Sequence, residues 1–163
     1  MKRLIAIIMV IIISIGLIGC GQNSDIRVPL NFYYCSDPVT YNSQTGVIAP
    51  EVREGSNITG LHDALNVYLD GPVSDGYRSI FPKNTSIVDI SQSEDILTVV
   101  LSDEIASLSD HKLTLACIGL SLTALELCDC SFVRIYAENS DLSSSPFIEI
   151  NRRNLLFIDS YSN

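Results

Sequence analysis

The sequence has few groups that could carry out catalysis. It contains two histidines, His62 and His111, which lie among polar neighbours on predicted helices, and we expect both to be solvated. A serine-hydrolase elbow, a Walker loop, a dinucleotide fingerprint and a zinc-protease helix are all missing from it. Asp103-Glu104 follows a predicted strand, where paired carboxylates could do acid–base work, but the simpler interpretation is that they favour the start of a helical turn over residues 103–107. We therefore predict a protein that is not an enzyme and that uses no cofactor.

Positive charge is also scarce. The chain has 10 Lys and Arg against 19 Asp and Glu, a net charge of −9. Two of the basic residues lie within residues 1–19, so a chain cleaved after Gly19 would keep 8 basic and 19 acidic residues, a net charge of −11. Such a domain is repelled by phosphate backbones and anionic lipid headgroups. We expect no nucleic-acid partner.

The N-terminus carries the features of a secretory signal. Lys2 and Arg3 precede an uncharged, almost wholly apolar run from Leu4 to Gly19, which ends in Leu17-Ile18-Gly19-Cys20. This ending is similar to the lipobox of bacterial lipoproteins, in which the cysteine sulfur takes a diacylglyceryl group and the chain is cut just before it. The alternative is a retained membrane helix, although the run of sixteen residues is shorter than the roughly 20 that a spanning helix needs.

Either interpretation places the rest of the chain outside the cytoplasmic membrane, with its N-terminus held there. We predict a lipoprotein signal peptide over residues 1–19, a lipidated Cys20 with a short tether over residues 20–26, and a single domain over residues 27–163. Two acyl chains give stable attachment to a bilayer, since each buried methylene contributes about 0.8 kcal/mol. The lipid bilayer is thus the first expected partner.

Four cysteines remain once Cys20 is assigned to the lipid: Cys35, Cys117, Cys128 and Cys130. Outside the cell they could form disulfides in any of three pairings, or stay as buried thiols. We expect Cys117 to be a small core residue on a helix. The sulfurs of Cys128 and Cys130 have neither a C-x-x-C spacing nor a nearby histidine pair, and we predict no metal site.

The pattern of apolar residues predicts an α+β fold. Strands are expected over residues 26–35, 47–53, 86–91, 96–101 and 131–137, and a closing hairpin over residues 147–150 and 155–158. Helices are expected over residues 57–69 and from Ser109 or Asp110 to about Leu127, because apolar side chains recur there at helical spacing. Asn57 or Thr59 could cap the first helix. The core order αββαβ predicts two helices on one face of a small mixed sheet, with an extra N-terminal strand and a C-terminal hairpin.

A glycine- and proline-rich stretch, "YLDGPVSDGYRSIFP", joins the first helix to the next strand. It could be a phosphate-binding loop, an active-site mouth or a plain connector. A phosphate loop follows a strand and precedes a helix N-terminus, which is the reverse of the order here. Gly71 and Pro72 are instead typical of a helix stop, since glycine adopts the left-handed conformation easily and proline cannot continue a helix.

The same stretch resembles the GerM domain of sporulation and spore germination proteins. In that family a helix ends in Leu-x-Gly-Pro, and a glycine, a serine and an apolar-Pro-x-small-Thr step then lead into a strand. The matching positions are Leu69, Gly71, Pro72, Gly76, Ser79, Pro82 and Thr85. Leu101-Ser102 also matches the end of the family's next strand, although Val100 stands where Asp is frequent. The resemblance covers roughly residues 31–139.

The resemblance implies a function in assembly rather than chemistry. The family's fold is similar to the ring-building motif of secretion and sporulation-channel proteins, and it offers no catalytic residues to carry over. We therefore expect a membrane-anchored, extracytoplasmic assembly or interaction domain linked to sporulation or germination, whose partners are further copies of itself or other envelope proteins. The alternative is an envelope accessory lipoprotein that binds a small ligand or modulates a membrane partner.

Overall fold

The computed structural model describes residues 29–38, 47–54, 58–151 and 153. The expected signal peptide, Cys20 and its tether, the proposed cap Asn57 and the second strand of the closing hairpin lie outside these residues. Within them, no helix is long and apolar enough to cross a membrane.

The expected α+β class is confirmed, but the strands form two sheets and not one. The first sheet is antiparallel, in the order β2-β1-β3, and the second has four strands in the order β4-β5-β6-β7. The strands are β1 (Pro29–Ser36), β2 (Ile48–Glu54), β3 (Tyr77–Arg78), β4 (Ile87–Ser93), β5 (Ile96–Leu101), β6 (Phe132–Ala137) and β7 (Phe147–Asn151). The N-terminal strand therefore does not extend the main sheet, but pairs with β2 and β3 in a sheet of its own.

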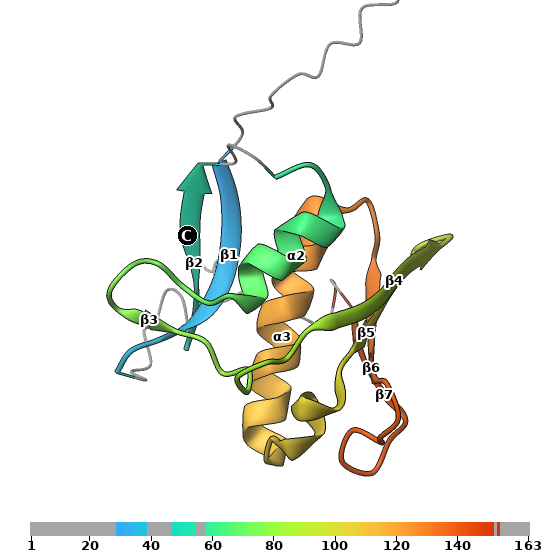
Figure 1. Ribbon diagram of the computed structural model, residues 1–163. Helices are drawn as coiled ribbons and strands as arrows, with labels where there is room; N and C mark the ends of the chain where they lie inside the picture. The colour runs from blue at the N-terminus through green and yellow to red at the C-terminus, as the bar shows by residue number, and fades with distance from the viewer. Residues whose placement is uncertain (1–28, 39–46, 55–57, 152, 154–163) are drawn as a thin grey trace, which may run out of the picture.

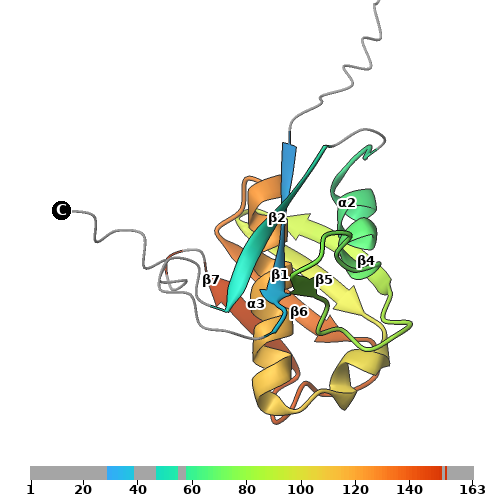
Figure 2. The same ribbon diagram turned by 90° about the vertical axis from the view of Figure 1, so that its left-hand side faces the viewer.

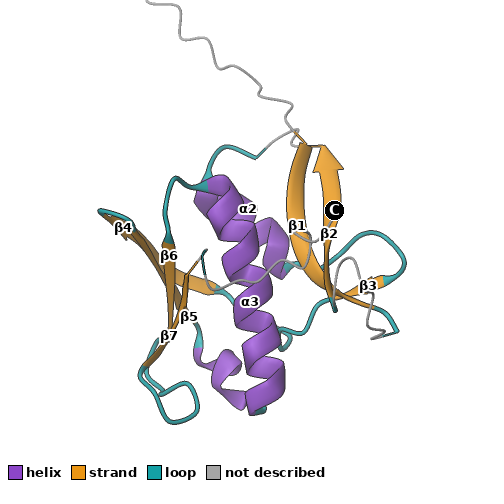
Figure 3. Ribbon diagram, turned by 180° about the vertical axis from the view of Figure 1, so that it is seen from behind, coloured by secondary structure: helices purple, strands orange, loops and turns teal. Residues whose placement is uncertain are grey.

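Two helices, α2 (Leu61–Leu69) and α3 (Asp110–Leu127), lie between the sheets (Figure 1). Figure 2 shows the three-stranded sheet in front of α3 and the four-stranded sheet behind it, and Figure 3 shows the same three layers from the back. A short 3-10 helix, η1 (Asp103–Ser107), precedes α3, as the acidic pair at its start predicted. The crossover from β5 through η1 and α3 to β6 makes β5 and β6 a parallel pair in an otherwise antiparallel sheet.

Because α3 lies between two sheets, it is buried on more than one side. The apolar residues at helical spacing predict a buried stripe of Leu113, Ala116, Cys117, Leu120, Ala124 and Leu127; all are buried except Leu127, which is half-buried. Positions outside the stripe are buried as well, among them Ser121, Leu122 and Thr123. A helix that is buried nearly all round belongs to the centre of a domain. The sequence pattern predicts only one buried face, because it predicts a single sheet; the second sheet covers the helix on its other side.

The inner face of the four-stranded sheet forms the other half of the core. Leu97, Val99 and Leu101 on β5 alternate with half-buried residues, and β6 shows the same period of two. The expected β4–β5 hairpin is confirmed, and β5 occupies an interior position of the sheet, as its apolar sequence predicted.

The unpaired part of the β1 edge is closed by side chains of the two helices. The backbone N–H of Tyr33 donates to Thr123 Oγ1 at 3.0 Å, and its carbonyl accepts from the Tyr68 hydroxyl at 3.0 Å. Gly119 makes this approach possible, because a Cβ at that position would lie 2.7 Å from the Tyr33 carbonyl oxygen and 2.6 Å from the Tyr68 hydroxyl. Helices α2 and α3 therefore take the place of a further strand along β1.

The start of α2 differs from the prediction. The helix begins at Leu61, with Gly60 in the capping position, so the capping residue itself has no side chain that could bond to the free backbone N–H groups. The hydroxyl of Thr59 donates instead to the carboxylate of Asp63. Thr59 is thus near the helix start, but it does not cap it.

Candidate functional site

The segment between α2 and β4, residues 70–86, is here called the connector. At its start Gly71 has φ +98°, and its N–H donates to the Tyr68 carbonyl at 3.1 Å, which confirms the predicted stop of α2. Gly76 also has a positive φ, +91°, and its carbonyl accepts from the Asp37 N–H at 2.8 Å. The two glycines turn the chain where a side chain would strain the backbone.

Ser79 and Thr85, which also resemble the GerM signature, form side-chain hydrogen bonds with the backbone of the connector. Ser79 Oγ accepts from the Phe81 N–H at 3.3 Å. Thr85 donates to the Pro82 carbonyl twice, from its N–H at 3.2 Å and from its hydroxyl at 2.9 Å, and this turn leads the chain into β4. Leu69 packs against the core, half-buried. Ser79 and Thr85 thus shape the connector, whereas Leu69 is part of α2 and of the core.

A buried carboxylate on β2, that of Glu51, forms hydrogen bonds with the backbone of the connector. Glu51 is 2% exposed, and one of its oxygens accepts from the backbone N–H groups of Val73 and Ser74, at 3.0 and 2.6 Å. Its other oxygen pairs with the guanidinium of Arg53, two residues along the same strand, with Nε at 2.6 Å. Sequence reasoning missed this pair, which we call the Glu51–Arg53 clamp.

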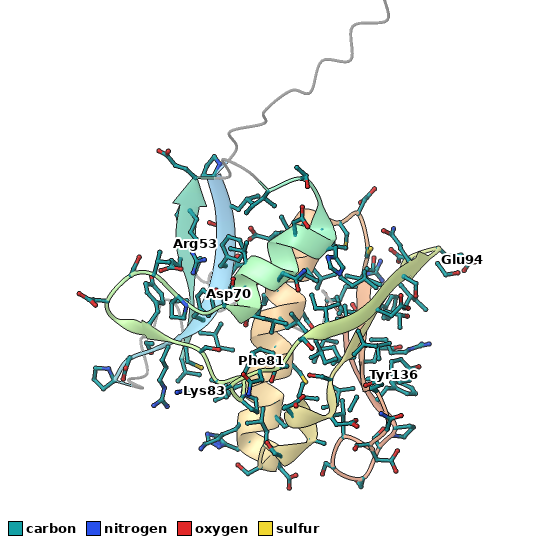
Figure 4. The ribbon with its side chains drawn as sticks, viewed as in Figure 1. Arg53, Asp70, Phe81, Lys83, Glu94 and Tyr136 are labelled. Atoms are coloured by element: carbon teal, nitrogen blue, oxygen red, sulfur yellow. The ribbon has the colours of Figure 1, made fainter. Side chains whose placement is uncertain are left out.

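Arg53 extends the clamp to the first turn of the connector and to the aromatic core. It donates to the Gly71 carbonyl at 2.7 Å and to the Tyr34 hydroxyl at 3.2 Å. Its guanidinium lies 4.8 Å from the centre of the Phe32 ring, within the range of a cation–π contact. Figure 4 shows Arg53 beside Asp70, at the point where α2 ends and the connector begins. The clamp therefore ties β2, β1 and the connector together.

The hydrogen bonds of the clamp decide the charge of Glu51. Burial alone would raise the pKa of this carboxyl, but the bonds from Ser74 and the contact with Arg53 outweigh burial and hold its pKa below the ordinary value. Burial raises the pKa of the Tyr34 and Tyr68 hydroxyls. The ionised Glu51 is thus fully used in structural contacts and is not presented to a substrate.

The residues first considered for chemistry are not brought together. His62 is exposed and bonds to Asn66 on its own helix, and His111 is exposed in the first turn of α3. The Asp103 carboxylate accepts from the backbone and side-chain nitrogens of Asn139, at 2.8 and 3.2 Å, and these bonds lower its pKa. Asp103 therefore joins η1 to the end of β6.

The cysteines are mostly core residues. Cys35, Cys117 and Cys130 are buried thiols that form no disulfide within the described part of the chain. Burial raises the pKa of Cys117 to about 12, as expected for a small core residue on a helix. No group of three or more metal-binding side chains occurs among the described residues.

A small cavity lies between the connector, β1 and α3. Tyr34, Tyr68, Phe81 and Ala116 are among the residues that line it, and its volume is about 10 Å³. A space of this size is at the lower limit for one water molecule. It is a packing gap at the junction of β1, α3 and the connector.

The outer face of the four-stranded sheet is covered by neither helix (Figure 3). Arg134 and Glu149 face each other there across β6 and β7, 2.6 Å apart, and the Arg134 guanidinium lies 4.9 Å from the centre of the Phe147 ring. The rings of Tyr136 and Phe147 are 5.4 Å apart. These cross-strand pairs stabilise the sheet on its solvent side.

The family model described as Germane, sporulation and spore germination, matches residues 31–143, which include the connector and the clamp. The chain belongs to the Germane family. Its structure is similar to the first GerMN domain of the sporulation protein GerM from Bacillus subtilis, at 13% identity and a TM-score of 0.57, over 78% of this chain and 99% of that one. It is also similar to the tandem GerMN domains of the same protein, at 18% identity and a TM-score of 0.55.

The second comparison covers 70% of this chain but only 40% of the tandem structure, so the chain spans less than half of that relative. No curated protein matches the sequence. The Germane family links this chain to sporulation and spore germination, and the GerMN structures share its fold.

Proposed function

We propose that this chain is a lipoprotein on the outer face of the cytoplasmic membrane, and that its Germane domain acts in sporulation or germination by binding other envelope proteins. The N-terminal sequence supports the anchor, because a basic start and a short apolar run lead directly to Cys20. The five residues from Gly21 to Asp25, if flexible, would reach roughly 12 Å. The domain would then sit close to the bilayer.

The observation that best supports a binding function is that the residues resembling the GerM signature set the backbone turns of the connector. Gly71, Gly76 and Thr85 set turns of the backbone, and the buried carboxylate of Glu51 holds the connector by its N–H groups. The residues that resemble the family signature thus fix the course of the backbone in this chain, and a preorganised surface suits recognition of another protein. We infer a non-catalytic function.

The alternative of a small-ligand carrier gains little from the cavity beside the connector. Its volume of about 10 Å³ compares with roughly 300–1,000 Å³ for ordinary ligand pockets. A ligand there would need α3 and the connector, which both line the cavity, to move apart.

The anchor is tested by feeding bacteria that express the full chain an alkyne analogue of palmitate and measuring the label on the purified protein. We expect label on the wild-type chain in the membrane fraction, and none on the Cys20→Ser variant. A Cys35→Ser variant is the matched control and should stay labelled. An unlabelled wild-type chain, or a Cys20→Ser variant that is labelled as strongly as the wild type, would overturn the lipid anchor. If the Cys20→Ser variant is still cleaved, it should leave the membrane fraction, and its retention there would favour the uncleaved helix.

The binding function is tested by isolating the full chain from cross-linked membranes of its own host during sporulation. The proposal predicts specific envelope proteins that are recovered with the wild-type chain and lost with a Gly71→Val variant that distorts the connector. Recovery of the same proteins with both chains, at equal amounts, would contradict a function that depends on this shape.

A further inference from the structure

The connector contains both Asp-Gly sequences of the chain, Asp70-Gly71 and Asp75-Gly76. Asp-Gly is prone to a spontaneous rearrangement, because glycine has no side chain to hinder attack of its backbone nitrogen on the preceding carboxyl carbon. The product is an isoaspartyl residue, in which the main chain runs through the side chain. Whether an Asp-Gly sequence rearranges in a folded protein depends on its local geometry, and here the two sequences have different geometries.

The first of them, Asp70-Gly71, is held closed. Asp70 keeps helical backbone angles at the end of α2, with φ −61° and ψ −18°. The N–H of Gly71 donates to the Tyr68 carbonyl at 3.1 Å, and the buried Gly71 accepts from Arg53 through its own carbonyl at 2.7 Å. Attack needs the Asp Cβ and the next nitrogen to be eclipsed about the Cα–C bond, which is far from a helical ψ. The Gly71 nitrogen is therefore both bonded and badly placed.

The second sequence, Asp75-Gly76, lies in an exposed turn. Gly76 has φ +91°, outside the helical region, and its N–H donates no hydrogen bond to another residue in the described part of the chain. A Cβ at Gly76 would meet no atom within 4 Å, so the space around this residue is open. The Gly76 nitrogen thus lacks both the hydrogen bond and the packing that hold Gly71.

We propose that Asp75 is a site of slow isoaspartate formation and that Asp70 is not. The Gly76 nitrogen attacks Cγ of the neutral Asp75 carboxyl group, the N–Cγ bond forms, and the carboxyl hydroxyl leaves with the amide proton as water. The cyclic succinimide then takes up one water molecule. Hydrolysis at Cγ restores Asp75, and hydrolysis at the main-chain carbonyl carbon gives the isoaspartyl form, so solvent water is the only co-reactant.

The isoaspartyl form changes the shape of the connector, because it adds one methylene carbon to the main chain. On one side of the turn the Ser74 N–H donates to Glu51 at 2.6 Å, and on the other the Gly76 carbonyl accepts from the Asp37 N–H at 2.8 Å. An extra main-chain atom between two held points lengthens or breaks one of these bonds. The modification therefore loosens the connector from β2 or from the residue that follows β1, which gives the connector a chemical lifetime beyond its proposed function.

The test keeps the full chain, purified in mild detergent, warm at neutral pH and samples it over days to weeks. Trypsin cuts after Arg53 and Arg78, so both Asp-Gly sequences lie on one peptide over residues 54–78 and are compared within it. Electron-transfer fragmentation in a mass spectrometer distinguishes the isoaspartyl form from Asp at each position. A second portion is kept unfolded in guanidinium chloride. Asp75→Glu is the matched control, because it keeps the charge but would have to close a larger ring.

We expect isoaspartate to accumulate at residue 75 at least about tenfold faster than at residue 70 in the folded chain, because residue 70 reacts only after local opening. In guanidinium chloride the difference should largely disappear. The aged wild-type chain should unfold at a lower urea concentration than the fresh chain, and the Asp75→Glu variant aged for the same time should not.

Equal rates at the two residues in the folded chain overturn this proposal, and so does a folded chain that forms no isoaspartate at residue 75. A difference that persists in guanidinium chloride also overturns it, because the preference would then come from the neighbouring sequence and not from the fold. An unchanged unfolding midpoint of the aged chain overturns the loosening of the connector. None of these results depends on Cys20 or on an envelope partner, so the proposed function is tested separately.

Discussion

At the scale of single residues, Glu51 is the one charged side chain among the described residues that is buried. It is almost fully buried, and its oxygens serve two backbone N–H groups of the connector and the guanidinium of Arg53. A buried ion pair stabilises a fold only when its hydrogen bonds are complete, and removing one partner leaves the other uncompensated. The clamp meets this condition through the connector.

We predict that Glu51→Gln lowers the free energy of unfolding by about 2–4 kcal/mol, because Arg53 is left without its counter-charge and an amide replaces the ionised acceptor of the N–H groups. Urea unfolding followed by circular dichroism measures this. Glu54→Gln, at the exposed end of the same strand, is the control and should change the stability by less than about 0.5 kcal/mol. Equal effects of the two substitutions would contradict the clamp.

The lowered pKa of Glu51 also predicts a dependence on pH. The folded-state pKa lies below the unfolded value of about 4.3, so the stability from the ionised carboxylate is complete above that value and is lost as the pH falls through the folded pKa. The difference in unfolding free energy between wild type and Glu51→Gln should therefore shrink as the pH is lowered from 7 to about 3. A difference that stays constant over this range would show that the charge of Glu51 does not act in the clamp.

At the scale of elements, the parts that follow from local patterns were predictable and the long-range pairings were not. The bounds of α3, the alternation of β5 and the stop at Gly71 follow from residues close in the sequence. The clamp joins β2 to a connector about twenty residues later, and a Glu and an Arg on an edge strand resemble ordinary solvated residues. The separate three-stranded sheet was missed for the same reason, since the sequence does not specify which strands pair.

The close packing of α3 against β1 predicts whether Gly119→Ala raises or lowers the stability of the protein. In an unpacked helix, Gly119→Ala would stabilise the protein by about 0.8–1.0 kcal/mol through helix propensity. Here the new methyl group would press on the Tyr33 carbonyl and the Tyr68 hydroxyl, so we expect a loss of about 1–3 kcal/mol. Thermal unfolding distinguishes the two outcomes, and a raised melting temperature would contradict the close approach of α3 and β1.

The turn at the start of the connector predicts the effect of Gly71→Val. A Cβ would meet only the Ser79 Cβ, at an ordinary 3.7 Å, so the cost comes from the positive φ. We expect a loss of roughly 1 kcal/mol or more, measured by urea unfolding. Asp75→Ala, an exposed change in the same segment, should be nearly neutral. An unchanged midpoint for Gly71→Val would refute the assignment of Gly71 as the helix stop.

At the scale of the whole molecule, two sheets enclose a central helix, and the connector leads the chain from α2 through β3 of the first sheet to β4 of the second. The glycine- and proline-rich stretch is held in this arrangement by its two glycine turns and by the backbone N–H bonds to Glu51. Its match to the Germane family links the chain to sporulation and germination. We propose that the chain acts there through its anchored shape and not through catalysis.

The most direct measurement of this claim is the count of heat-resistant, germinating spores in the organism that encodes the chain, after deletion of its gene and complementation with variants. We predict that deletion lowers the count and that both the wild type and a His62→Ala, His111→Ala variant restore it, whereas Cys20→Ser and Gly71→Val do not. An unchanged count after deletion would contradict the account, and so would failure of the folded double-histidine variant to restore it.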